Sequence, residues 1–203
     1  MRASCRLFSC RTGQRAVHDA AMTIEIRTMR HTDPPTIAAA FAALGWPGKT
    51  IGHYERYLTE QTKGERSALV AECDGEFAGY VTVRWESDYE PFRAAGIPEI
   101  SDLNVLPPLR RRGIATALLD RAEGLIAARS AIAGIGVGLY EDYGPAQRLY
   151  VRRGYVPDGR GIVYDWQAVE PGAMIRLDDD AVLMLTRDLH RAGSARGTSG
   201  DVR

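Results

Sequence analysis

The chain has 203 residues, of which 45% are hydrophobic and 26% charged, and its formal net charge is zero. This length favours one globular domain with a sizeable core. The balanced charge argues against nucleic-acid binding, which needs a basic surplus, and no apolar run approaches the roughly 18 residues of a membrane span. We therefore expect a soluble protein that binds neither nucleic acid nor membrane.

The cysteines Cys5, Cys10 and Cys73 have no zinc-site or disulfide-framework spacing. We expect no metal site. Cys73 follows an apolar run, which is typical of a buried thiol in a reducing cytoplasm. The predicted location is therefore cytoplasmic.

Both ends of the chain differ in composition from the middle. Residues 1–21 are rich in arginine and lack a sustained apolar period. They resemble either an organelle transit peptide or, as we favour, an upstream extension before a domain that begins near Met22. Residues 190–203 lack apolar side chains to bury, so we expect a frayed tail. The predicted organisation is a leader over 1–21, a domain over 22–189 and a disordered tail over 190–203.

The first part of the domain predicts a strand and two helices. Residues 23–29 alternate apolar and polar side chains, as a half-buried strand does. Asp33-Pro34 suits an N-cap followed by the first helical residue, and that helix should end near Gly45. A second helix is predicted over residues 50–61, with its tyrosines and Leu58 on one side.

The middle of the chain predicts a hairpin followed by a strand and a long helix. Strands over 67–73 and 77–85 flank Asp74-Gly75, a strong signal for a tight turn. A further strand is expected over 99–105. The helix over 113–129 places small and aliphatic residues on one core-facing stripe.

The remaining elements are shorter. Residues 134–139 form a strand pattern with glycine at every second position, so its glycines share one face. A bare face permits close approach of a ligand or another backbone, but it also describes a merely weak strand. A short helix over 145–153 should end at Gly154, a residue suited to the left-handed C-cap. Strands beginning at Tyr155 and spanning 181–187 complete the pattern.

The segment that joins the strand over 99–105 to the long helix is rich in proline and arginine. A helix start leaves backbone N–H groups free and carries the positive end of the helix dipole. Gly113 lets the backbone come close to a ligand, and arginines stand beside it. Such a loop is suited to holding phosphate, although an arginine-rich surface turn would look the same.

Two motifs resemble the GNAT (GCN5-related N-acetyltransferase) family. Arg110-x-x-Gly113-x-Ala115 is similar to its pyrophosphate-binding signature, Q/R-x-x-G-x-G/A. Ala146-x-x-Leu149-Tyr150-x-x-x-Gly154-Tyr155 is similar to its later motif. The resemblance covers roughly residues 23–189. It implies the α/β (α+β type) GNAT fold, a mixed central sheet of about seven strands with helices on both sides.

The resemblance implies acetyl-CoA as the acetyl donor. Backbone amides of the arginine-rich loop would hold the pyrophosphate, and the strand before it would line the pantetheine arm as an added strand does. The Val105 N–H would polarise the thioester carbonyl, as in an oxyanion hole. The expected cofactor contacts are Leu103, Asn104, Val105, Arg110, Arg111, Arg112, Gly113, Ile114, Ala115, Thr116, Ala146 and, more weakly, Tyr143, which replaces the family's usual asparagine.

Catalysis by this chemistry needs a base, because an alkylamine with a pKa of about 10 is mostly protonated at neutral pH. Glu99 and Asp102 are the candidates. They lie on opposite faces of an ideal strand, so at most one points at the acceptor unless the strand bulges. Either could instead be a salt-bridged strand carboxylate. In the family the tyrosine of the Leu-Tyr pair commonly protonates the thiolate, which implies this role for Tyr150; the alternative is a core aromatic.

The acceptor is not identified by the sequence. An acidic segment from Glu86 to Asp102 favours a small cationic molecule with a primary amine. A protein N-terminus or lysine is the alternative acceptor, and a catalytically silent acyl-CoA-binding regulatory module is the alternative from another class. A nucleotide-phosphate binder is disfavoured because no Walker or Rossmann pattern occurs. A homodimer is possible.

Overall fold

The computed structural model describes residues 22–46 and 48–190 of the chain. The predicted leader over residues 1–21 lies outside the described residues. The predicted tail also does, except for His190. The limits of the domain therefore remain predictions.

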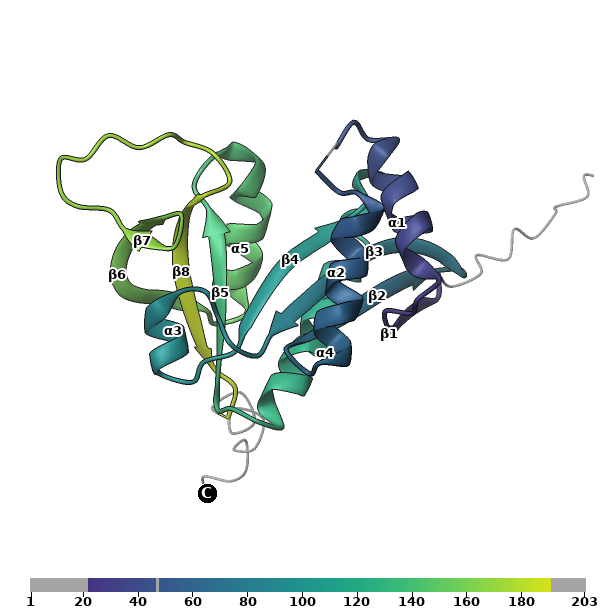
Figure 1. The fold of residues 1–203 in the computed structure, drawn as a ribbon, viewed down its shortest axis with the longest axis horizontal. Helices are drawn as coiled ribbons and strands as arrows, with labels where there is room; N and C mark the ends of the chain where they lie inside the picture. Colours follow the sequence, from purple (N-terminus) through teal and green to yellow (C-terminus); the bar gives the residue numbers. More distant parts are fainter. Residues whose placement is uncertain (1–21, 47, 191–203) are drawn as a thin grey trace, which may run out of the picture.

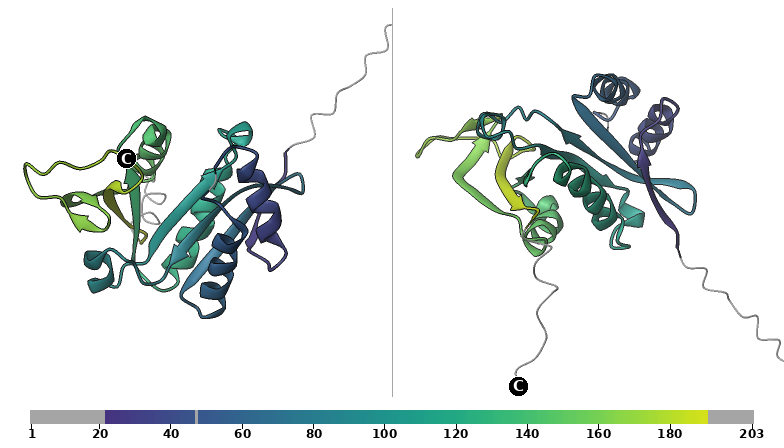
Figure 2. Two further views of the ribbon diagram at one scale, coloured as in Figure 1. Left: turned by 45° about the horizontal axis from the view of Figure 1, so that its top comes forward. Right: turned by 90° about the horizontal axis from the view of Figure 1, so that it is seen from below.

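The described chain forms one sheet with helices on both faces (Figures 1 and 2). The strands, in the spatial order β1-β2-β3-β4-β5-β8-β6-β7, are β1 (Ile24–Thr28), β2 (Arg66–Cys73), β3 (Glu76–Arg84), β4 (Glu99–Val105), β5 (Ile132–Gly138), β8 (Ala181–Asp188), β6 (Val156–Tyr164) and β7 (Gln167–Ala168). The helices are α1 (Asp33–Ala42), α2 (Ile51–Thr62), α3 (Glu90–Ala94), η1 (Pro107–Leu109), α4 (Ile114–Ala127), η2 (Glu141–Tyr143) and α5 (Gly144–Arg152). The expected mixed class is confirmed. The two-residue β7 and the short α3 were not predicted.

The central strands are buried on both faces. Leu69 and Val81 pack toward α4, whereas Val70 and Tyr80 pack toward α1 and α2. Figure 1 shows α1 and α2 in front of the sheet and α4 behind it. Because neighbouring residues of a strand point to opposite faces, β2 reads as a nearly continuous apolar run.

Two turns follow from residues that tolerate left-handed backbone. Asp74 and Gly75 have φ values of 52° and 84°, as a tight hairpin requires. Gly154 has a φ of 88° directly after α5, as predicted for a helix that ends at a left-handed residue.

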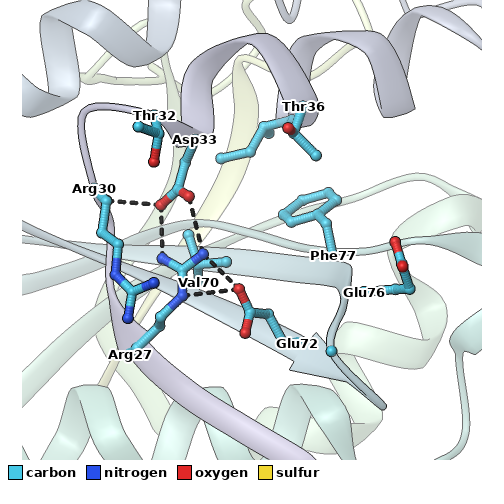
Figure 3. Close-up of a pocket in the computed structure, with 11 residues that line it drawn as sticks. Arg27, Arg30, Thr32, Asp33, Thr36, Val70, Glu72, Glu76 and Phe77 are labelled. Atoms are coloured by element: carbon cyan, nitrogen blue, oxygen red, sulfur yellow. Dashed lines mark hydrogen bonds and ion pairs between the residues drawn. The ribbon is translucent and has the colours of Figure 1, made fainter.

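The start of α1 corrects one expectation. Asp33 was predicted as the N-cap, but Thr32 holds that position and Asp33 is the first helical residue. The Asp33 carboxylate instead accepts hydrogen bonds from the Arg27 guanidinium at 2.7 and 2.9 Å and from the Arg30 N–H at 2.6 Å (Figure 3). Arg27 also donates to Glu72. These ion pairs anchor α1 to β1 and β2.

The alternating glycines of β5 make room for side chains. A Cβ at Gly134 would lie 2.2 Å from the Phe92 ring, and one at Gly138 would lie 2.4 Å from the Tyr143 ring. Side chains, and not another backbone, lie closest to this face of the strand. The glycines let α3 and η2 pack closely against the strand.

The sheet divides at its one parallel pair of strands. β4 and β5 are in register only at Glu99 with Gly134 and at Ile100 with Ile135. Beyond these residues the strands diverge, as Figure 1 shows. The edge of β4 from Ser101 to Val105 is therefore not paired with β5, and we call this unpaired edge the opening beside β4.

Candidate active site

The loop before α4 exposes the start of the helix. Arg111 and Gly113 adopt left-handed backbone, with φ values of 62° and 86°. The first helical N–H to find a backbone acceptor is that of Ala117, which donates to the Gly113 carbonyl at 3.0 Å. The preceding amides, those of Ile114, Ala115 and Thr116, lie at the positive end of the helix dipole. This arrangement is chemically suited to a phosphate group.

The side chains of the three arginines of this loop make different contacts. The Nε of Arg110 donates to the Val105 carbonyl at 3.2 Å, so its side chain folds back onto the end of β4. Arg111 and Arg112 are exposed to solvent. Arg110 is exposed as well, and the Arg112 guanidinium contacts the Met22 sulfur at 3.9 Å, so of the three only Arg111 makes no side-chain hydrogen bond within the described residues.

The Val105 N–H points into the opening beside β4. The next amide, that of Leu106, donates to the Ala78 carbonyl on the β3 side at 2.9 Å. Successive N–H groups of a strand point in opposite directions, so the Val105 N–H points away from β3. It is therefore available to a carbonyl oxygen that enters between β4 and β5.

A bulge interrupts β4 at Asp102. Thr82 pairs with Ser101 and Tyr80 with Asn104, so two residues of β4 oppose Val81 alone. Asp102 has a left-handed φ of 54°. Because of this bulge, both Ser101 and Asp102 make contacts on the side of the sheet covered by α2.

The Asp102 carboxylate accepts several hydrogen bonds. Its donors are Tyr80 Oη at 2.6 Å, Tyr57 Oη at 2.7 Å, Asn104 Nδ2 at 2.8 Å, His53 Nε2 at 3.3 Å and the ammonium of Lys49. Burial raises the pKa of Asp102, but the His53 hydrogen bond and the Lys49 charge outweigh it, so the pKa falls below the usual carboxyl range. Asp102 is thus a partly buried carboxylate that is ionised at neutral pH because donors of the protein itself stabilise its charge.

Glu99 has the opposite environment. It is 2% exposed and accepts a hydrogen bond from the Ser87 hydroxyl at 2.5 Å. Burial raises the pKa of Glu99, and the Ser87 hydrogen bond and the Arg84 charge lower it only in part. The result is a carboxyl group whose pKa is above its ordinary value.

Tyr150 lies on α5 within the main core and is 5% exposed. Burial raises the pKa of its phenol. Its hydroxyl makes no hydrogen bond with any residue that the structure describes, whereas the neighbouring Tyr155 donates to Glu123 at 3.0 Å. Tyr150 is therefore a neutral phenol with a free donor.

Several of the other expected cofactor contacts already have partners within the described residues. Leu103 and Ala146 pack against the main core, and the Asn104 amide is occupied by Asp102 and by the Tyr80 hydroxyl at 3.3 Å. The Tyr143 hydroxyl donates to Asp179 at 3.0 Å, so this tyrosine is already engaged by the loop before β8.

The partners of Asp102 were largely missed by the sequence reasoning. His53 and Tyr57 lie one helical turn apart on α2, and Tyr80 lies on β3. No local pattern links these segments, because they meet only when α2 packs on the sheet. Lys49 precedes the N-cap Thr50, and no sequence pattern marked it as a residue of the site.

A second hollow lies at the far edge of the sheet, near the start of α1 (Figure 3). It has a volume of about 350 Å³ and is lined by Arg27, Asp33 and Glu72 among others. These charged groups are engaged with one another. None of the residues that line this hollow belongs to β4 or β5.

This chain belongs to the acetyltransferase (GNAT) family, whose profile matches residues 29–155. The family confirms the expected enzyme class. No curated protein matches the chain significantly.

Solved structures share the fold at low identity. A Staphylococcus aureus Mu50 N-acetyltransferase is 17% identical, with a TM-score of 0.63 over 82% of this chain and 99% of that one. A spermidine N-acetyltransferase chimera of the Vibrio cholerae SpeG and hSSAT is 15% identical, with a TM-score of 0.61 over 84% and 98%. The Salmonella typhimurium acetyltransferase that modifies the N-terminal serine of ribosomal protein L7/L12 is 14% identical, with a TM-score of 0.61 over 82% and 95%.

In residues 22–46 and 48–190, no helix is long and apolar enough to cross a membrane. In the same ranges, no three histidine, cysteine or acidic side chains are grouped as metal ligands would be.

Proposed function

We propose that this protein transfers the acetyl group of acetyl-CoA to a primary amine of a small cationic molecule. The donor follows from the family, and the amine-binding character rests on one observation. That observation is Asp102, a partly buried and ionised carboxylate that contacts two phenol groups and the Lys49 ammonium. An anionic site of this kind favours cations over carboxylates.

The cofactor would lie along the opening between β4 and β5. The amides of Ile114 to Thr116 would hold its pyrophosphate at the helix start, with Arg111 and Arg112 adding charge. The Val105 N–H would donate to the thioester oxygen as this oxygen gains negative charge.

Glu99 is our choice as the base. A general base works best when its pKa lies near the operating pH, and burial moves the pKa of Glu99 in that direction. Asp102 is a poor base because its pKa is lowered. Since Glu99 is 2% exposed, it would take the ammonium proton through a water molecule.

Tyr150 would complete the transfer. As the amine nitrogen bonds to the carbonyl carbon, the carbon–sulfur bond breaks and the thiolate needs a proton. The Tyr150 hydroxyl is neutral and has a free donor, so it can supply that proton. Solvent would return a proton to the phenolate.

The experiment is an amine panel with acetyl-CoA, in which CoA release and the mass of the product are both measured. Polyamines and diamines should be acetylated in preference to acidic amino acids. A basic peptide in the panel tests the alternative protein acceptor. Binding of acetyl-CoA without turnover of any amine would instead indicate a silent regulatory module.

A further inference from the structure

The surroundings of Asp102 form an ammonium-binding site that is built by the chain itself. Lys49 Nζ contacts the Asp102 carboxylate, donates to Tyr80 Oη at 2.8 Å, and lies 5.5 Å from the centre of the Tyr80 ring. Carboxylate, phenol oxygen and aromatic face are the groups that recognise an alkylammonium. The Lys49 side chain is 21% exposed, so this contact is partly screened from solvent.

One further hydroxyl at this site has no partner. Tyr54 is fully buried, and its Oη makes no hydrogen bond within the described residues. Its ring packs edge-on against Tyr80, with the ring centres 5.4 Å apart. A buried polar atom without a partner carries a free-energy cost, and Lys49 makes no hydrogen bond with this hydroxyl.

This site suits a cation that does not react. An ammonium held by an ionised carboxylate is stabilised in its protonated form, and attack on a thioester requires the neutral amine. The reacting amine therefore belongs near Glu99, whose higher pKa suits proton removal. Asp102 is better suited to a second positive charge on the same acceptor.

We propose that the Asp102 site binds a second, non-reacting ammonium of the acceptor, and that Lys49 occupies this site until the acceptor displaces it. The acceptor class is thus a diamine or polyamine. This inference rests on the proposed function and adds to it a specificity-determining carboxylate and a tethered competitor.

The exchange preserves the balance of charge. When the acceptor ammonium replaces Lys49, the Asp102 carboxylate keeps a cationic partner, so no buried charge is left uncompensated. Lys49 then moves to solvent from the loop between α1 and α2, where Gly48 precedes it. A glycine beside it gives the backbone freedom for this movement.

The first test follows Lys49 in the wild-type protein by NMR. Lys49 and Lys63 are the only lysines in the sequence, so protein labelled with ¹³C at lysine Cε gives one signal from each. Lys63 is exposed at the end of α2 and serves as the internal reference. The probes are 1,4-diaminobutane and spermidine, with 1,4-butanediol as the uncharged control.

Both amines should move the Lys49 signal toward that of Lys63, and butanediol should not. An unchanged Lys49 signal at about 10 mM of either amine would overturn the proposal, since a ligand with a Kd of 1 mM would then fill about nine-tenths of the sites. This measurement needs no acetyl-CoA. It therefore stands even if the protein proves not to acetylate amines.

The second test removes the competitor. Lys49→Ala should strengthen binding of 1,4-diaminobutane by about tenfold or more, because apparent affinity is reduced by the fraction of sites that are available. Lys63→Ala is the matched control and should not change it. Calorimetry gives the affinities, and equal affinity of Lys49→Ala and wild type would contradict the tethered competitor.

A rate comparison tests the second charge. Wild type should favour 1,4-diaminobutane over the isosteric 4-amino-1-butanol by about tenfold or more in kcat/KM, and Asp102→Asn should remove most of this preference. A preference that Asp102→Asn leaves intact would exclude Asp102 as its source. Absence of turnover with every amine would count against the proposed function. The NMR and calorimetry results would then decide whether the Asp102 site binds a diamine.

Discussion

Glu99 and Asp102 lie three residues apart on β4, yet their environments move their pKa values in opposite directions. Glu99 is buried beside one hydroxyl, and Asp102 is surrounded by donors and a lysine. The bulge at Asp102 places its side chain on the side of the sheet that α2 covers. Carboxyl groups tuned apart in this way can take separate roles, one exchanging a proton and one holding a charge.

Glu99→Gln tests the base. We expect kcat/KM to fall about 10²-fold at neutral pH, the usual scale for loss of a general base. In wild type the active form of Glu99 is ionised, so activity should be lost as pH falls through its raised pKa. This loss of activity at low pH is the acid limb of the pH profile. It should be missing from the residual activity of Glu99→Gln.

The control for this variant is Glu25→Gln, on an exposed position of β1. It should have the rate and pH profile of wild type. A Glu99→Gln enzyme that retained the acid limb would assign that limb to another group and exclude Glu99 as the base.

Tyr150→Phe tests the proton donor. The rate constant kcat should fall about 10²-fold, while the melting temperature should barely change, because the hydroxyl makes no hydrogen bond with a described residue. Tyr155→Phe is a matched control, since it removes a hydrogen bond to Glu123 that is worth about 1 kcal/mol. That variant should melt earlier and turn over normally. The reverse pattern would make Tyr150 a core aromatic only.

The sequence predicted the order of the longer elements because their signals are local. Alternation marked β1, Asp74-Gly75 marked the hairpin, and Gly154 marked the end of α5. The start of α1 was placed one residue late, since the Asp33 carboxylate is used by Arg27 from a neighbouring strand instead of by the helix. Short α3 was missed because five residues give no helical period.

The candidate site was predicted only in part, for a related reason. The glycine of the loop before α4 and the carboxylates of β4 are visible in one stretch of sequence. The bulge at Asp102 and its contacts with Tyr57 and Tyr80 depend on packing between three elements. Roles that depend on such long-range contacts cannot be assigned from spacing alone.

Gly113→Ala tests the loop before α4. Both Gly113 and Gly172 have a φ of 86°, where an alanine is strained by about 1 kcal/mol. Gly113→Ala and Gly172→Ala should therefore lose similar stability. Only the first should weaken acetyl-CoA binding, by about tenfold, measured by calorimetry. Equal affinities in the two variants would remove this loop from the cofactor site.

Asp102→Asn tests the ionised carboxylate through the pH dependence of stability. Removing one partner of a buried ion pair typically costs about 3 kcal/mol, and Asp102 is 18% exposed, so the cost should be near this scale. Because the pKa of Asp102 is lowered on folding, its contribution is complete above the ordinary carboxyl value of 3.8 and is lost as pH falls below it. The free energies of unfolding of wild type and Asp102→Asn should thus differ most near neutral pH and become similar in acid. Asp142→Asn, at an exposed position, should follow wild type throughout. Denaturant unfolding across pH measures the free energy of unfolding of wild type and of both variants. If the difference between wild type and Asp102→Asn does not shrink below pH 3.8, the contacts of Asp102 do not stabilise its ionised form.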